Sequence, residues 1–171
     1  MTELPILNTE RLILRLPEMG DFAGYWDILR ADIHGYMGGP FSELDAWDEY
    51  CMMRGRWALR GTGLFAVTLK DGTLIGFCGV DRERGDPADE LGYLFLADYH
   101  GQGYATEASL AARDFAHHTL NIHLLISCVA HGNTASLTLA QKLGAVPAPD
   151  LYDMEMGGVT IFRHPDPEAA L

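Results

Sequence analysis

The chain has 171 residues, of which 48% are hydrophobic and 21% charged, and this size and composition predict one soluble globular domain. No stretch reaches the roughly 20 apolar residues of a membrane helix, and the start of the chain lacks the pattern of a secretory signal, so we expect a cytoplasmic protein without a membrane partner. The formal net charge of -12 argues against a nucleic-acid partner, because nucleic acids bind to basic surfaces. Three separated cysteines without a CxxC pair indicate neither a disulfide framework nor a zinc site.

The first third of the chain predicts a strand followed by two helices. Residues 9–16, TERLILRL, alternate leucine with arginine or isoleucine, which is the two-residue period of a half-buried strand. Asp21 can cap a helix that runs to about residue 29. Residues 43–60 predict a longer helix, because bulky apolar side chains recur at helical spacing from Trp47 to Trp57.

The middle of the chain predicts three strands. Residues 64–69 and 74–80 are short β-rich runs around the pair Asp71-Gly72, and such a pair is a strong signal for a hairpin turn. Residues 90–96, ELGYLFL, predict the next strand after a polar loop.

The last third predicts helices at 105–120 and 133–143, with a strand at 124–129 between them and a closing hairpin of residues 151–156 and 159–164. The resulting order, βααβββαβαββ, predicts an α+β fold, a mixed sheet with helices on both faces. No linker or repeat divides the chain, so we expect a single domain over residues 1–171 with a loose tail from residue 164.

The most informative segment is YHGQGYATEA, residues 99–108, which lies between a predicted strand and the start of a helix. Gly101 and Gly103 let a ligand approach the backbone closely, and the unpaired N–H groups of the first helical turn form a site for an anion such as a phosphate. The chain contains no GxxxxGK[ST] string, which excludes a Walker A loop. A dinucleotide fingerprint is disfavoured, because Thr106 stands where that motif needs glycine or alanine.

The same segment resembles the [QR]xxGx[GA] motif of the GNAT acetyltransferase family, with histidine at the first position. The Rim-type branch, which modifies the amino termini of ribosomal proteins, is similar in TERLILR, ELGY, GYATEA and NTASLTLAQKLGA, so the resemblance spans residues 9 to about 145. It implies the GNAT acyl-CoA N-acyltransferase fold, with a central, mostly antiparallel sheet of six to seven strands and about four helices. It also implies acetyl-CoA as cosubstrate.

The resemblance assigns the acetyl-CoA contacts residue by residue. Backbone groups of strand 90–96 would pair with the pantetheine arm, amides of the glycine-rich turn would hold the pyrophosphate, and Asn133 would contact the pantetheine. Asn133 is also placed to cap its helix, and both roles can hold together. The expected cofactor-binding residues are Tyr93, Leu94, Phe95, His100, Gly101, Gln102, Gly103, Tyr104, Ala105, Thr106 and Asn133.

Acetyl transfer to an amine needs a base for the amine proton and an acid for the leaving thiolate. Glu90, at the start of the cofactor strand, is the first candidate for the base, with Asp81 and Glu83 as alternatives. Many GNAT enzymes carry a tyrosine seven residues after the asparagine, but this chain has Ala140 there. Ser136 stands where Rim-type enzymes present a serine, so it is the expected proton donor. No HExxH or Cys/His cluster occurs, and we expect no metal.

The acceptor is expected to be a protein amino terminus or a small-molecule amine, and the sequence leaves these two open. It would enter between the early helices and the closing hairpin, where the available side chains are Tyr25, Trp26, Asp27, Asp32, Tyr36, Met37, Glu43 and Asp45. The alternatives are an acyl-CoA-binding module without catalysis, or a homodimeric interaction protein in which the cofactor only stabilises the fold.

Overall fold

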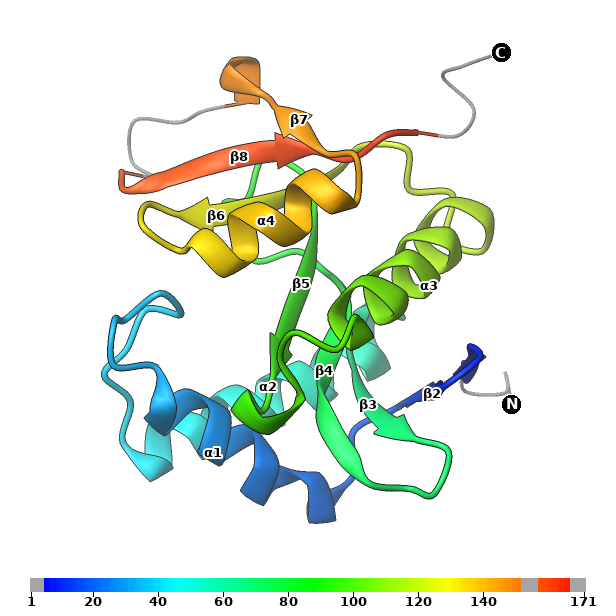
Figure 1. Ribbon diagram of the computed structural model, residues 1–171, viewed down its shortest axis with the longest axis vertical. Coiled ribbons are helices and arrows are strands. Elements are labelled where there is room, and N and C mark those ends of the chain that lie inside the picture. Colours follow the sequence, from blue (N-terminus) through cyan, green and yellow to red (C-terminus); the bar gives the residue numbers. More distant parts are fainter. Residues whose placement is uncertain (1–4, 152–156, 167–171) are drawn as a thin grey trace.

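The computed structural model describes residues 5–151 and 157–166, which form one twisted sheet with helices on both faces (Figure 1). The described strands follow the spatial order β1-β2-β3-β4-β5-β6-β8-β7. In chain order they are β1 (Leu7–Asn8), β2 (Leu12–Arg15), β3 (Gly63–Leu69), β4 (Leu74–Asp81), β5 (Asp89–Phe95), β6 (Leu125–Ala130), β7 (Val146–Pro147) and β8 (Val159–Arg163). The helices are α1 (Phe22–Ala31), α2 (Glu43–Arg60), α3 (Tyr104–His118) and α4 (Thr134–Lys142). The predicted mixed, mostly antiparallel sheet with four helices is confirmed.

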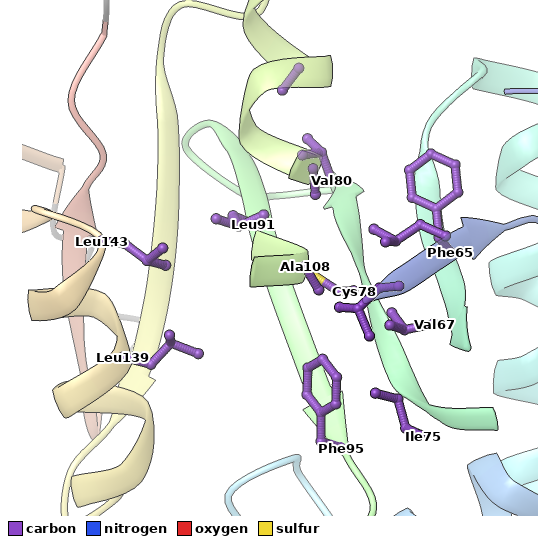
Figure 2. Packing of buried hydrophobic residues seen from close by; sticks show 14 of the residues in the cluster. Phe65, Val67, Ile75, Cys78, Val80, Leu91, Phe95, Ala108, Leu139 and Leu143 are labelled. Carbon is purple, nitrogen blue, oxygen red and sulfur yellow. The ribbon is translucent and has the colours of Figure 1, made fainter. Parts of the chain in front are cut away.

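Helices cover the sheet on both faces, because neighbouring residues of a strand point to opposite sides. Ala66 of β3 and Phe77 of β4 pack with α1 and α2. Phe65 and Cys78, one residue away in each strand, pack instead with Ala108 and other residues of α3. Figure 2 shows this second cluster, which also includes Leu139 of α4 and Leu143 at the end of that helix. No helix in the described residues is both long and apolar enough to cross a membrane.

The sheet splits between β5 and β6, the one parallel pair among the described strands. These strands pair only at Asp89↔Leu125 and Glu90↔Ile126, although β5 continues to Phe95 and β6 to Ala130. Figure 1 shows β6 turning away from β5 toward β8 and α4. One edge of β5 is therefore left without a neighbouring strand beyond Glu90.

Local signals explain where the sequence predictions were accurate. Helix α2 has its predicted bounds because Ser42 and Asp45 form a capping box at its start, and Gly61, in the left-handed conformation at φ 71, ends it. The hairpin of β3 and β4 turns at Gly72, whose φ is 90.

The strand predicted over residues 9–16 is shorter than expected. The backbone N–H of Leu12 donates to Oγ1 of Thr9 at 2.9 Å, so the chain turns there and only Leu12–Arg15 continues as β2. The preceding residues fold back as β1, a strand that the sequence reasoning missed.

The predicted closing hairpin needs correction. Leu151 ends a 3-10 turn rather than starting a strand, and residues 152–156 lie outside the described residues. Strand β8 pairs instead with β6 and with the two-residue strand β7, which directly follows the helix stop at Gly144. With β1 and β7 included, eight strands are described, against the six to seven expected.

His164 was expected to begin a loose tail, but it is buried, with 2% of its surface exposed. Oγ of Ser127 donates to the carbonyl of Leu91 at 2.7 Å, so it accepts from Nε2 of His164 at 2.9 Å. The buried Nδ1 of His164 has no partner among the described residues. Burial, with smaller contributions from Arg113 and His117, lowers the pKa of His164 to about 4. Residues 167–171 of the expected tail lie outside the described part.

We expect His164 to make the fold acid-sensitive. The unfolded chain binds a proton near pH 6.5 and the folded chain only near pH 4, so this contribution to stability is present above pH 6.5 and is lost as the pH falls toward 4. The shift corresponds to about 3 kcal/mol. Urea unfolding of the wild type and His164→Gln at pH 7.5 and 4.5 measures it. The stability advantage of the wild type should shrink by about that amount at the lower pH, whereas a constant difference would contradict the assignment.

Candidate functional site

The exposed edge of β5 offers backbone groups to an extended ligand. The Leu91 carbonyl faces β6, since it accepts from Ser127. Alternation along the strand then places the backbone groups of Tyr93 and Phe95 on the same side, beyond the last pairing with β6. His100 Nε2 donates to the Phe95 carbonyl at 2.8 Å, which leaves the N–H and C=O of Tyr93 and the N–H of Phe95. We call these groups the free edge of β5, and an extended chain can add to it as a strand would.

Leu94 differs from its two neighbours. Its backbone faces β4, because a Cβ added at Gly76 would lie 2.5 Å from the Leu94 carbonyl oxygen. Leu94 therefore contributes a partly buried side chain, packed with the cluster under α1 and α2, and no free backbone edge.

The predicted anion site lies at the start of α3. Gly101 and Gly103 are both in the left-handed conformation, at φ 73 and 83, and Gly103 is the N-cap residue without a side-chain cap. Among the described residues, no protein acceptor binds the backbone N–H groups of residues 101–106, a set that includes Tyr104, Ala105 and Thr106. Such consecutive free donors at the positive end of a helix suit a phosphate group. We call residues 100–106 the glycine turn.

Two polar side chains of the glycine turn fold back onto the chain. Nε2 of Gln102 donates to the carbonyl of Asp98 at 2.9 Å, and His100 binds the last carbonyl of β5 as described above. His100 stands at the first position of the [QR]xxGx[GA] motif, and its hydrogen bond joins the glycine turn to the end of β5. Its predicted cofactor contact stays a prediction.

Two sequence motifs, TERLILR and GYATEA, meet beside the glycine turn. Glu107 accepts from Oγ1 of Thr9 at 2.6 Å and from the backbone N–H and Nε of Arg11 at 2.8 and 2.6 Å. Nη1 of Arg11 donates to the carbonyl of Gln102 at 3.1 Å, and its guanidinium lies 4.5 Å from the ring centre of Tyr104. Arg11 therefore places a cation beside the predicted phosphate site. The sequence analysis used TERLILR only as a sign of family resemblance and did not predict this role.

Glu90 lies in a cavity of about 290 Å³ on the face of β5 that carries α1 and α2. Its Oε1 accepts from the backbone N–H of Cys128 at 2.9 Å. Burial raises the pKa of Glu90 to about 7, despite this hydrogen bond. A carboxyl group with a pKa near neutrality can both take up and release a proton at pH 7, which suits a general base. The cavity is lined by one cation, Arg56, and by the carboxylates Glu49, Asp81, Glu83, Asp86 and Glu90.

The alternative bases are less suited to proton transfer. Nη1 of Arg56 donates to Asp81 at 2.8 Å, and its Nη2 donates to Glu83 at 3.0 Å. Both carboxylates are thus held in ion pairs with Arg56, whereas Glu90 accepts from a backbone N–H. The geometry favours Glu90.

Ser136 lies on the other side of the split, at the start of α4. Its backbone N–H donates to Oδ1 of Asn133 at 3.0 Å, so the predicted capping role of Asn133 is confirmed. Its Oγ lies 3.0 Å from the hydroxyl of Tyr93 on β5. Ala140, at the position where many members of the resembled family carry a tyrosine, is fully buried. The phenol of Tyr93, which sequence reasoning considered only for its backbone, therefore reaches the expected proton donor.

The predicted acceptor residues separate into two groups. Tyr25 and Met37 line the cavity, Trp26 packs with the cluster beside it, and the hydroxyl of Tyr36 donates to the Gly132 carbonyl across the split at 3.0 Å. None of the predicted carboxylates lines the cavity. Asp27 pairs with Arg30, and Asp32 accepts from the N–H of Met37. The Asp45 carboxylate accepts from the N–H of Ser42 in the capping box of α2, and Glu43 lies exposed in the first turn of that helix. The acidic residues that do line the cavity come mostly from β4, β5 and the loop between them.

In residues 5–151 and 157–166, no three His, Cys, Asp or Glu side chains gather so that they could hold a metal ion.

Known proteins are similar to this chain in fold and in sequence. Residues 11–146 match the family described as "Acetyltransferase (GNAT) domain". The uncharacterised N-acetyltransferase p20 of Bacillus licheniformis is 30% identical over 146 residues, which cover 80% of this chain and 80% of that protein. An acetyltransferase from Agrobacterium tumefaciens str. C58 has a TM-score of 0.89 at 32% identity, with 97% of both chains covered. Mycobacterium smegmatis RimJ, solved with CoA-disulfide, has a TM-score of 0.72 at 18% identity over 96% of this chain and 87% of its own. The predicted fold is thus confirmed, and the chain belongs to the GNAT acetyltransferase family.

Proposed function

We propose that the protein transfers an acetyl group from acetyl-CoA to a primary amine, as a Rim-type member of its family. The observation that carries the proposal is the position of Glu90, a partly buried carboxyl group with a pKa of about 7, in an acidic cavity beside the free edge of β5. Glu90, the free edge of β5 and the glycine turn follow one another along the chain, and they would serve as proton acceptor, backbone edge and anion site.

Acetyl-CoA fits the hydrogen-bonding groups of the free edge of β5 and of the glycine turn. Tyr93 and Phe95 would pair with the amides of the pantetheine arm, and the free N–H groups of the glycine turn would bind the pyrophosphate. Arg11 would add a positive charge there, although Glu107 already neutralises part of it. Backbone donors explain how a chain with a net charge of -12 can bind an anionic cosubstrate. The complex of RimJ with CoA-disulfide, in a protein of the same fold, is consistent with this use.

Catalysis would require two proton movements. A free amine of the lysine type has a pKa of roughly 10.4 and is protonated at neutral pH, so Glu90 would accept a proton from the incoming amine. Ser136 would supply a proton to the departing sulfur. The backbone N–H of Phe95, on the free edge, would donate to the thioester carbonyl and stabilise the negative charge that develops there.

The acidic cavity favours a cationic acceptor, because its carboxylates outnumber its one arginine. A protein amino terminus and a small amine both meet this requirement. The absence of the usual tyrosine at Ala140 gives some support to the alternative, a module that binds acyl-CoA without catalysis.

Calorimetric titration with acetyl-CoA followed by a thiol-release assay tests the proposal. The assay compares amino-terminal peptides, polyamines and aminoglycosides at pH 8. Micromolar binding with release of thiol that depends on the amine is the expected result. Binding without release from any amine would favour the non-catalytic module, and absence of binding would overturn the cosubstrate assignment.

A further inference from the structure

Tyr93 and Ser136 are linked across the split in the sheet. The Tyr93 hydroxyl lies 3.0 Å from Oγ of Ser136, and either hydroxyl can donate to the other. The Ser136 carbonyl, at 3.3 Å, is a more distant acceptor for the same phenol proton. The two residues are 43 positions apart, and they come from β5 and from the first turn of α4. The phenol is half-buried, and its ring packs against the cluster under α3. It therefore has a fixed position beside the expected proton donor.

A serine alone is a poor acid for the reaction. The leaving thiol resembles cysteine, with a pKa of roughly 8.5, whereas an aliphatic hydroxyl gives up its proton much less readily. A phenol has an ordinary pKa of roughly 10. Burial raises the pKa of Tyr93 above that value, but a phenol is still a stronger acid than an aliphatic hydroxyl. A phenol that replaces the serine proton as it leaves would make Ser136 effective, because no alkoxide then has to form.

The placement of the base supports the same scheme. Tyr93 follows Glu90 by three residues in β5, so the two side chains lie on opposite faces of the sheet. Glu90 faces the acidic cavity, and Tyr93 faces α3 and α4. The free edge of β5 lies between them, and a thioester bound there would have the proton acceptor on one side and the hydroxyl pair on the other.

We infer that Tyr93 is a positioning and proton-supplying residue that acts through Ser136 in acetyl transfer, in place of the tyrosine missing at Ala140. This inference rests on the proposed function. As the nitrogen–carbonyl bond forms and the carbon–sulfur bond breaks, sulfur takes the proton of Ser136, and Ser136 takes the proton of Tyr93. Glu90 takes the proton of the cationic amine and passes it to water, and it then takes the second N–H proton, which nitrogen loses after the attack, and releases that as well. The phenolate regains one proton from water, so the reaction of a cationic amine releases one proton overall.

The test compares Tyr93→Phe, Ser136→Ala and the double variant with the wild type, using the acetyl-CoA reaction with the best amine of the panel. Each single variant should lower kcat at least tenfold and leave the KM for acetyl-CoA within about twofold. The double variant should be no slower than the slower single variant, since both changes interrupt one chain of proton transfer. Independent, multiplied losses, or a wild-type kcat for Tyr93→Phe, would overturn the inference.

A second donor separates proton supply from a structural role. The acetyl thioester of 4-nitrothiophenol releases a more acidic thiol that needs no proton donor, so Tyr93→Phe and the wild type should acetylate the amine from it at equal rates. A variant that is equally impaired with both donors would show that Tyr93 only supports the structure.

Tyr50→Phe is the control, because it also removes a phenol hydroxyl bound to a backbone carbonyl, in a buried side chain on the face of the sheet that carries α1 and α2. It should keep the wild-type kcat. If Tyr93→Phe does not fold, Ser136→Ala and Ser136→Thr still decide, because only the threonine variant retains a hydroxyl and should recover activity. A wild type without amine-dependent thiol release would refute the proposed function itself, which is a different outcome from an active wild type whose Tyr93→Phe variant is unimpaired.

Discussion

Glu90→Gln is expected to lower kcat at least 100-fold at pH 8 and, at the same time, to stabilise the protein by about 2 kcal/mol. Loss of a general base accounts for the first effect. The second follows from the pKa of Glu90, which burial raises from 4.5 to about 7. The contribution of a raised pKa to stability is present below pH 4.5 and is lost as the pH rises through 7. At pH 8 the wild type bears the full penalty of a buried charge, and glutamine does not.

Glutamine keeps the shape of the side chain and can still accept the hydrogen bond from the backbone N–H of Cys128. Guanidinium unfolding at pH 5 and pH 8 separates the effect of charge from that of packing. The stability gain of Glu90→Gln should be large at pH 8 and small at pH 5, because the folded wild type carries a protonated Glu90 at the lower pH.

Asp114→Asn is a suitable control, because it removes an exposed carboxylate from α3. It should leave kcat and the free energy of unfolding at pH 8 unchanged. A stability gain for Glu90→Gln that is the same at pH 5 and pH 8 would contradict the raised pKa, and an unchanged kcat would exclude Glu90 as the base.

The sequence predicted the parts of the fold that local chemistry determines. Helix α2 was predicted over its full length from the helical spacing of its bulky apolar side chains, and its observed ends are set by the adjacent residues Ser42 and Gly61. The hairpin of β3 and β4 was predicted from Asp71-Gly72. Strands β1 and β7 have two residues each, which is too short for any periodicity to appear. Their pairing depends on strands elsewhere in the chain.

The split between β5 and β6 could not be predicted, because a parallel pairing of two residues leaves no mark on either strand. The site shows the same limit. Glu90 was a reasonable choice from its place at the start of a strand, but its raised pKa comes from a cavity built by several distant elements. Likewise, Arg11 meets the glycine turn across 91 residues, and Tyr93 meets Ser136 across 43. Contacts of that range need the folded chain.

The glycine turn, by contrast, combines a local motif with a local function, and Gly103→Val tests both together. We expect the affinity for acetyl-CoA to fall at least 100-fold, or about 2.7 kcal/mol. Gly103 has a φ of 83, which valine strongly disfavours, and its Cβ position lies 3.4 Å from Nη2 of Arg11. A branched side chain there would crowd the free N–H groups that we assign to the pyrophosphate. Calorimetric titration measures the affinity.

Gly72→Val is the control for the backbone strain that valine introduces at a glycine with positive φ. Gly72 has a similar φ of 90, and no atom lies within 4 Å of its Cβ position in the hairpin turn, so the substitution introduces comparable strain without touching the site. Both variants should lose similar stability in thermal unfolding, and only Gly103→Val should lose affinity. Wild-type affinity in folded Gly103→Val would therefore remove the pyrophosphate from the start of α3.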